Sequence, residues 1–371
     1  MTDALIVGGG VIGLSLAYEL AGEGWKVRVV DRGVPGREAS WAGAGILPPA
    51  GAAAANDPYD RLLQLSNELH RAWSARLREE TGVDNGLRRC GGIYLARDVA
   101  TADELGRSVE SWRRAGVALE ELSAAELARR EPSLAGGAAS PGLRSAYLLP
   151  DETQLRNPRH LKALLAGCAL RGVEVGAGVA VEDFEIRGER IASVQTSNGQ
   201  IGAEMVCLTS GPWTRALLAR LGVQAAMQPV RGQMALLNSA RPLLHAIVNE
   251  GPRYLVPRPD GRILVGSTEE QAGFEKRTTA EGIAGLLAFA TGIAPGLKAA
   301  QFEQCWAGLR PGTLDGLPYL GRLPGLGNAF VAAGHFRSGL QLSPGTALVM
   351  GRLMRGLDPE IDLSPFRVDR G

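Results

Sequence analysis

The stretch ALIVGGGVIG, residues 4–13, decides the fold of this chain. Its first four residues are apolar and predict a buried strand, and the segment Val11–Gly22 after the glycines has the pattern of a helix. A second apolar run, Lys26–Val30, ends at Asp31. These segments predict one βαβ unit, and the glycines between its first strand and its helix match the pattern G-x-G-x-x-G of dinucleotide-binding proteins.

Each glycine of this pattern has a physical role in such a site. Gly8 permits a tight turn, Gly10 lets the backbone approach a pyrophosphate, and Gly13 lets the helix pack closely on the strand. The free N–H groups at the start of the helix attract phosphates, and Asp31 can accept hydrogen bonds from ribose hydroxyls. The motif alone leaves open FAD, NAD and a glycine-rich turn that binds no nucleotide.

Length and composition limit the classes of protein to consider. The 371 residues exceed the size of a single core and predict two domains. A net charge of +1 argues against nucleic acid or an anionic membrane as a partner, and no apolar run approaches the roughly 20 residues of a membrane span. With no basic leader and no paired cysteines, a cytoplasmic protein without disulfides is predicted. The dispersed histidines and cysteines predict no metal site.

Elements that could extend the first unit recur late in the chain. Helix and strand patterns near residues 160–215 and 325–355 predict a discontinuous nucleotide-binding part. We assign residues 1–85, 151–221 and 306–371 to it, and residues 86–150 and 222–305 to a second, substrate-binding part. Because residues 228–267 read mostly as strands with tight turns, the second part is expected to hold a sheet.

Three local predictions concern less regular segments. The Gly-, Ala- and Pro-rich segment Glu38–Ala54 is expected to be irregular. Asn157 followed by Pro158 predicts a helix start in which Asn157 is the N-cap. A last helix is predicted near Pro344–Arg355, after a buried strand at Ala329–Ala333.

Four further stretches, taken in order, carry a family resemblance. They read ASWAGAGI at residues 39–46, TSGPW at 209–213, WAGLRPGT at 306–313 with DGLPYLG at 315–321, and GHFRSGL at 334–340. Together with the glycine motif they make the chain similar, over nearly its whole length, to the D-amino acid oxidase family, and within it to the glycine oxidases of thiamine biosynthesis. The resemblance implies an α/β fold, with a FAD-binding Rossmann-like domain of the GR2 type and a second substrate domain of α+β type built on an antiparallel sheet.

The resemblance also implies which residues hold FAD without a covalent bond. They are Gly8, Gly10, Val11, Ile12, Gly13, Asp31, Arg32, Ala39, Ser40, Ala44, Gly45, Ile46, Val181, Gly211, His335, Phe336, Arg337, Ser338, Gly339, Leu340 and Gln341. Much of this contact would come from backbone N–H groups and small side chains. His335 is expected to pack rather than to act as an acid or a base. Cys305 lies near the place where sarcosine oxidases carry a flavin-linked cysteine, but the surrounding motif is not theirs.

For the substrate, the resemblance points to Tyr254, Arg310 and Arg337. The chemistry of the residue itself also favours Arg310, because an amino acid must be oriented by its carboxylate and a guanidinium binds that group with two parallel hydrogen bonds. A core tyrosine, a surface arginine and a structural arginine are the respective alternatives. Glu269 stands where some relatives carry an apolar pocket residue, and a carboxylate there could alter substrate preference.

The implied activity is FAD-dependent oxidative deamination of glycine, or of small amines and D-amino acids such as sarcosine and D-alanine. The α-hydrogen would leave as hydride, O2 would be reduced to hydrogen peroxide, and the imine would give glyoxylate and ammonia or supply the thiazole moiety of thiamine. Alternatives are a sarcosine or D-amino acid oxidase, a quinone-linked amino acid dehydrogenase, a nicotinamide-dependent dehydrogenase and a flavin-binding protein without turnover. Because relatives are often tetramers, a homo-oligomer is expected.

Overall fold

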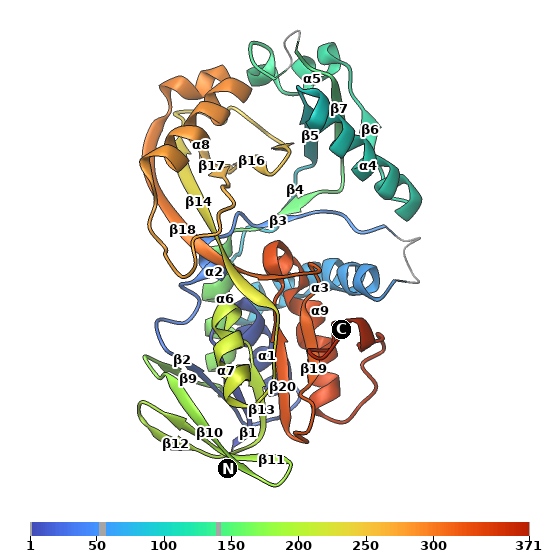
Figure 1. Cartoon of the computed structure of the whole chain (residues 1–371). Helices are drawn as coiled ribbons and strands as arrows, with labels where there is room; N and C mark the ends of the chain where they lie inside the picture. The colour runs from blue at the N-terminus through green and yellow to red at the C-terminus, as the bar shows by residue number, and fades with distance from the viewer. Residues whose placement is uncertain (1, 52–56, 139–141, 371) are drawn as a thin grey trace.

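The computed structural model describes residues 2–51, 57–138 and 142–370, and within them the chain forms two large sheets. Figure 1 shows the six-stranded sheet in the lower half of the molecule and the eight-stranded sheet in the upper half. Helices flank both sheets, so the α/β class predicted from the sequence is confirmed. Two three-stranded sheets complete the strand pairing of the described residues.

The six-stranded sheet is built around the predicted βαβ unit. Its strands, in spatial order, are β19 (Tyr319–Arg322), β20 (Ala329–Ala333), β13 (Ala203–Leu208), β1 (Thr2–Val7), β2 (Val27–Asp31) and β9 (Glu174–Ala177). All neighbours are parallel except β19 and β20. Parallel strands are covered on both faces and therefore read as continuous apolar runs. The predicted first strand, the helix α1 (Val11–Gly22) and the second strand are confirmed.

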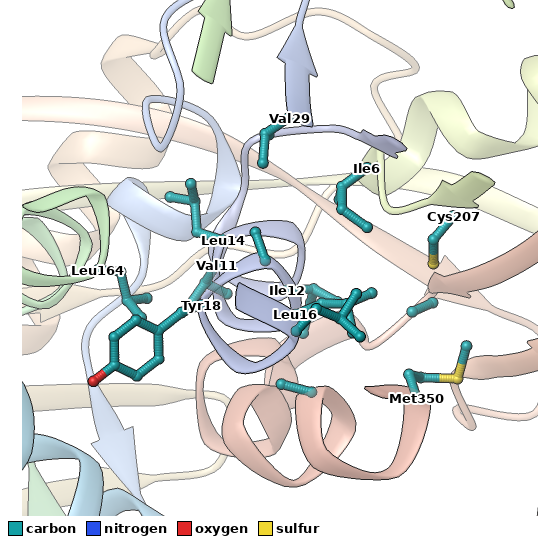
Figure 2. Packing of buried hydrophobic residues seen from close by; sticks show 14 of the residues in the cluster. Ile6, Val11, Ile12, Leu14, Leu16, Tyr18, Val29, Leu164, Cys207 and Met350 are labelled. Carbon is teal, nitrogen blue, oxygen red and sulfur yellow. The ribbon is translucent and has the colours of Figure 1, made fainter. Parts of the chain in front are cut away.

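Layers of helix and strand cover the two faces of this sheet. One face carries α1, α3 (Pro58–Thr81), α6 (Asn157–Leu170) and α9 (Gly339–Met354), and the other carries β10 (Val181–Arg187), β11 (Arg190–Thr196), β12 (Gly199–Ile201) and α7 (Thr214–Arg220). Ile6 points into the first core and Leu5 into the second, because successive side chains of a strand alternate between its faces. Figure 2 shows the first core around α1, with Met350 of α9 near Leu16.

The eight-stranded sheet is antiparallel except for the pair β15 and β5. Its strands, in spatial order, are β18 (Gln301–Thr313), β14 (Met227–Asn238), β17 (Arg262–Gly266), β16 (Arg253–Pro257), β15 (Ile247–Glu250), β5 (Gly92–Ala96), β7 (Ser145–Leu149) and β6 (Glu120–Glu121). The helix α4 (Val99–Ala115) packs against Ala96, whereas α5 (Ala124–Arg130) and α8 (Ala280–Ile293) cover the other face, which carries Ile93 and Leu95. On the opposite face, Met234 and Val256 pack against Ala44 from the N-terminal part of the chain.

The strands β14 and β18 connect the two halves of the molecule. They pair in antiparallel fashion from Met227 opposite Thr313 to Asn238 opposite Gln301, and Figure 1 shows them running from the upper half toward the lower. Met227 lies in a core of the six-stranded sheet, whereas Leu237 lies in the core of the eight-stranded sheet. The predicted boundary between residues 305 and 306 falls inside β18. The division into domains therefore stays a prediction.

Short elements join these layers. The strand β8 (Thr153–Gln154) pairs with both β3 (Ile46–Leu47) and β4 (Arg88–Arg89). The short helices are α2 (Ala39–Ala42), η1 (Pro132–Leu134), η2 (Gly211–Trp213), η3 (Pro295–Ala299), η4 (Phe336–Ser338) and η5 (Ser364–Phe366). Among the described residues, no helix combines the length and apolar character needed to cross a bilayer.

Three local predictions need correction. The segment Glu38–Ala54 was expected to be irregular, but it contains α2 and β3, while its residues 52–54 lie outside the described residues. Asn157 is not the N-cap of α6, which is Arg156, because the Asn157 side chain donates to the Ser40 carbonyl instead.

The last helix, α9, begins at Gly339, earlier than predicted, and contains Pro344. A proline inside a helix removes the hydrogen bond to the carbonyl four residues before it. Here the Leu340 carbonyl accepts from Ser343 Oγ at 2.8 Å and from His70 Nε2 at 3.1 Å. These two donors replace the missing backbone donor, so the helix starts directly after η4.

Candidate active site

The glycine turn after β1 is packed so tightly that two of its positions admit no side chain. Gly8 has a φ of +119°, and a Cβ there would lie 2.7 Å from the Thr209 carbonyl. A Cβ at Gly13 would lie 1.9 Å from the Gly8 carbonyl oxygen. Gly10, the N-cap of α1, itself provides no side-chain cap for the helix. The turn therefore presents bare backbone and a helix N-terminus, as a pyrophosphate site requires.

Asp31 stabilises this turn from the end of β2. Its Oδ2 accepts the N–H of Gly9 at 2.8 Å, and its Oδ1 accepts the N–H of Gly33 at 2.8 Å. Ser40 Oγ accepts the N–H of Val11 at 2.9 Å from the other side. Asp31 also lines the neighbouring cavity, and a carboxylate oxygen can accept a second hydrogen bond there, for example from a ribose hydroxyl.

A cavity of about 440 Å³ lies at the carboxyl ends of β1, β2, β13 and β20. In open α/β sheets, ligands bind outside the carboxyl ends of the strands. The predicted cofactor residues that line this cavity are Gly8, Gly10, Val11, Ile12, Asp31, Arg32, Ala39, Ser40, Val181, Gly211, His335, Phe336, Arg337, Gly339 and Leu340. The fold thus brings together residues from both ends of the chain, as a dinucleotide site in this position would require.

A second cavity of about 310 Å³ adjoins the first. The residues that line both are Ala39, Gly43, Asn157, Arg310, Arg337 and Leu340. The other predicted residues of the second cavity are Ala44, Gly45, Ile46, Tyr254, Ser338 and Gln341. Of the predicted site residues, Gly13 lines neither cavity, because it lies under the turn against Gly8.

Arg310 extends from β18 to the junction of the two cavities. Its Nη2 donates to Ser267 Oγ at 2.6 Å, and its Nη1 donates to the Thr268 carbonyl at 3.3 Å. A Cβ at position 232 would lie 2.4 Å from Arg310 Nη1, so glycine there makes room for the guanidinium. Burial lowers the pKa of Arg310, and the neighbouring Tyr254 acts in the opposite direction. Both acceptors are neutral, so the positive charge is available to a carboxylate that enters the cavity.

Tyr254 belongs to a row of side chains on one wall of the smaller cavity. It stands opposite Asn249 on the next strand, and Asn249 stands opposite Tyr94 on the strand after that. All three residues line the smaller cavity. Tyr254 Oη donates to Met234 Sδ at 3.4 Å. Because a thioether is a weak acceptor, the hydroxyl can turn to a stronger one such as a carboxylate.

Arg337 differs from Arg310 because it is already paired. Its Nε donates to Glu269 Oε2 at 3.1 Å, and its Nη2 donates to the same oxygen. The two side chains are 38% and 43% exposed, so the pair lies at the rim of the cavities. A direct contact between Arg337 and the substrate stays a prediction.

His335 is poorly suited to proton transfer. Burial lowers its pKa to about 3, so the imidazole is neutral at physiological pH. Its Nε2 lies 3.1 Å from Thr346 Oγ1 in α9. These observations support the expected packing role.

Asn157 is a site residue that was not predicted. It lines both cavities, and its Nδ2 donates to the Ser40 carbonyl at 2.8 Å. Its buried Oδ1 has no partner among the described residues. An open acceptor at a cavity wall fits a ligand with N–H or O–H donors, and a flavin nucleotide has both. The pattern Asn-Pro concealed this role because it also describes a helix start.

Two further features were missed for lack of a sequence signal. The guanidinium of Arg32 lies 3.7 Å above the ring of Trp213, and both residues line the larger cavity. Glu152 is fully buried behind the smaller cavity, where it accepts from Tyr94 Oη at 2.7 Å and from Asn249 Nδ2 at 3.5 Å. Burial raises the pKa of Glu152 to about 7.

Comparison with known proteins identifies the family of this chain. Residues 3–353 match the family model described as FAD dependent oxidoreductase. The glycine oxidase of Pseudomonas putida is 35% identical over 98% of this chain and 97% of its own length. The crystal structure of glycine oxidase from Geobacillus kaustophilus is 35% identical with a TM-score of 0.93, and the match covers 100% of this chain and 98% of that one.

A third similar protein acts on a different substrate. The crystal structure of iminodiacetate oxidase from Chelativorans sp. BNC1 is 28% identical with a TM-score of 0.87, and the match covers 99% of each chain. The resemblance inferred from the sequence motifs is thereby confirmed over the whole chain. The chain belongs to the family of FAD-dependent oxidoreductases, and its cofactor is FAD.

Proposed function

We propose that this protein uses FAD to oxidise glycine to its imine, and that O2 takes up the electrons as hydrogen peroxide. The observation that carries the proposal is Arg310, a half-buried guanidinium with neutral partners at the junction of a nucleotide-sized cavity and a smaller one. The similarity of the whole chain to glycine oxidases supports glycine as the substrate. Sarcosine and D-alanine are proposed as further substrates, since one methylene changes binding by only about 1–3 kcal/mol.

FAD supplies the electron acceptor when it is bound. Arg310 binds the substrate carboxylate with two N–H donors, and the Tyr254 hydroxyl donates to the same group. This contact fixes the orientation of the α-carbon, while the apolar Met234 and Leu340 exclude water from the smaller cavity. Because His335 is a poor proton acceptor, the substrate amine loses its extra proton to solvent and reacts in the neutral form.

FAD is proposed to be held without a covalent bond. Cys305 Sγ lies 3.7 Å from Thr278 Oγ1, and Cys305 lines neither cavity. The four cysteines are free thiols, which supports a cytoplasmic location. By resemblance, we propose that the imine serves the thiazole moiety of thiamine and that the protein is a homo-oligomer.

Peroxide release by the purified yellow protein tests this function. With glycine under air, hydrogen peroxide, glyoxylate and ammonia should form in equal amounts, and glycine should bleach the flavin when O2 is excluded. Sarcosine and D-alanine, assayed in parallel, rank the substrates. Bleaching without peroxide would assign a dehydrogenase with another electron acceptor. A yellow protein that no amino acid bleaches would leave flavin binding without turnover.

A further inference from the structure

The guanidinium groups of Arg310 and Arg337 line both cavities, and the loop after β17 gives each of them a different hydrogen-bond acceptor. Thr268 offers Arg310 a neutral carbonyl oxygen, whereas the next residue, Glu269, offers Arg337 a carboxylate. The pair of Arg337 and Glu269 has no net charge, so these three side chains together carry a single positive charge. This net positive charge of one is complementary to a substrate with one carboxylate.

The fold determines that Glu269 faces Arg337. The following residue, Glu270, exchanges both backbone hydrogen bonds with Arg231 at 2.9 Å each. Its Oε2 accepts from Arg231 Nε at 3.1 Å, and its Oε1 accepts from Gln233 Nε2 at 2.7 Å. The Arg231 side chain is only 7% exposed, so this anchor lies inside the protein. With the residues on both sides of it fixed, Glu269 is directed to the rim.

Both charges of the rim pair act at the carboxylate site. Arg337 lowers the pKa of Arg310 and Glu269 raises it, after the larger effects of burial and of Tyr254. The two effects oppose each other while the pair is intact. Removing the carboxylate of Glu269 would therefore leave a second cation beside the first one.

We propose that Glu269 restricts this enzyme to amino acids with a single carboxylate, because it neutralises the guanidinium that would otherwise bind a second one. The inference rests on the proposed amino acid oxidase function and names the substrate class of the same site. Glu269 acts through Arg337 and touches neither the reacting atoms nor the first carboxylate. A dicarboxylate such as iminodiacetate, which is glycine with a second acetate on its nitrogen, would gain a second ion pair in its absence.

Ligand binding to the FAD-loaded protein tests the proposal without turnover. The absorbance of the flavin is titrated with acetate and with malonate for the wild type, E269Q and the control E275Q, which removes a carboxylate of the same loop that pairs with Arg231 and Arg277. In E269Q, the affinity for malonate should rise about tenfold, more than that for acetate, since an unpaired cation at the rim attracts the second charge. E275Q should keep the wild-type ratio of the two affinities.

A double variant and turnover complete the test. Adding R337Q to E269Q should abolish the gain for malonate, and high salt should reduce it. In kinetics, E269Q should raise kcat/KM for iminodiacetate relative to glycine, while sarcosine relative to glycine stays constant. An unchanged malonate-to-acetate ratio in E269Q, or a gain that survives R337Q, would overturn the proposal. Absence of turnover with every amino acid would instead refute the proposed function, because the binding experiment does not depend on it.

Discussion

Arg310 shows how one residue can hold a positive charge ready for a substrate. Its partners Ser267 and Thr268 accept hydrogen bonds from two of its N–H groups through neutral oxygens. A substrate carboxylate therefore does not have to displace a negatively charged group from these two contacts. Glycine at position 232 provides the space for it. A charge with only neutral partners in a half-buried site is costly to the free protein, and a substrate carboxylate relieves that cost.

R310K is therefore expected to raise KM for glycine about tenfold to a hundredfold. Lysine keeps the charge but offers no planar fork, so the two parallel hydrogen bonds to the carboxylate are lost. Steady-state peroxide production measures the effect, with the FAD content of each preparation as the control. A KM equal to that of the wild type would remove Arg310 from the carboxylate site.

G13A should lose FAD. The added methyl would lie 1.9 Å from the Gly8 carbonyl oxygen, and two backbone segments would have to separate to admit it. The matched control is G106A in the exposed part of α4, where a Cβ meets no atom within 4 Å and alanine favours the helix. Flavin retained per chain after gel filtration should fall in G13A and stay at the wild-type level in G106A.

At the scale of elements, the strands β16, β15 and β5 form one wall of the smaller cavity, and the buried carboxyl group of Glu152 lies behind this wall. Tyr94 and Asn249 face the smaller cavity from this wall, and Glu152 lies behind them with no exposure to solvent. Burial raises the pKa of Glu152 to about 7, so the carboxyl group stays mostly protonated below that pH. The unfolded chain loses that proton near pH 4, so the buried acid disfavours the folded state progressively between these values.

E152Q should therefore become more stable relative to the wild type as the pH rises from 5 to 7. The folded wild type keeps the Glu152 proton in this range while the unfolded chain has lost it, so its unfolding free energy falls by about 1.4 kcal/mol per pH unit from this group. Glutamine does not titrate and avoids the loss. Thermal midpoints of both proteins across this range measure the difference, which should level off above pH 7. Parallel curves would contradict the buried acid.

Elements with local signals were predicted well from the sequence. The βαβ unit was identified because its strands are apolar, its helix follows the glycines directly, and an acid ends its second strand. The start of α9 was placed too late because a proline normally ends a helix, and Pro344 is acceptable inside one because side-chain donors, among them the distant His70, bind the Leu340 carbonyl. Asn157 was misassigned for a similar reason, since Ser40 lies 117 residues away in the sequence.

At the scale of the whole molecule, the cavities depend on both sheets. Asp31 comes from the six-stranded sheet and Tyr254 from the eight-stranded one. The residues that the family resemblance assigns to the site line one or both cavities, except Gly13, and their contacts with cofactor and substrate stay predictions. The pairing of Glu269 with Arg337 could not be foreseen, because the two residues are 68 positions apart and carry no mutual spacing pattern.

Removal of FAD should lower the unfolding temperature of the entire chain. A ligand that binds only the folded state adds about 2.7 kcal/mol of stability at one hundred times its Kd. Because both sheets line the cavities, calorimetry should show the transitions of both halves moving together when FAD is stripped and returning when it is restored. A transition that FAD does not move would indicate a half that folds independently of the cofactor.

The long paired strands β14 and β18 also govern how small molecules reach the flavin. The strand β14 is fixed in one core at Met227 and in another at Leu237, and β18 pairs with it over this length, so a movement of one half against the other has to bend this ladder. A clamshell opening of the molecule is therefore not expected as an entry route. We expect access through the loop that carries Glu269, whose movements are those of a short surface segment, in nanoseconds to microseconds, and are faster than the rotation of domains.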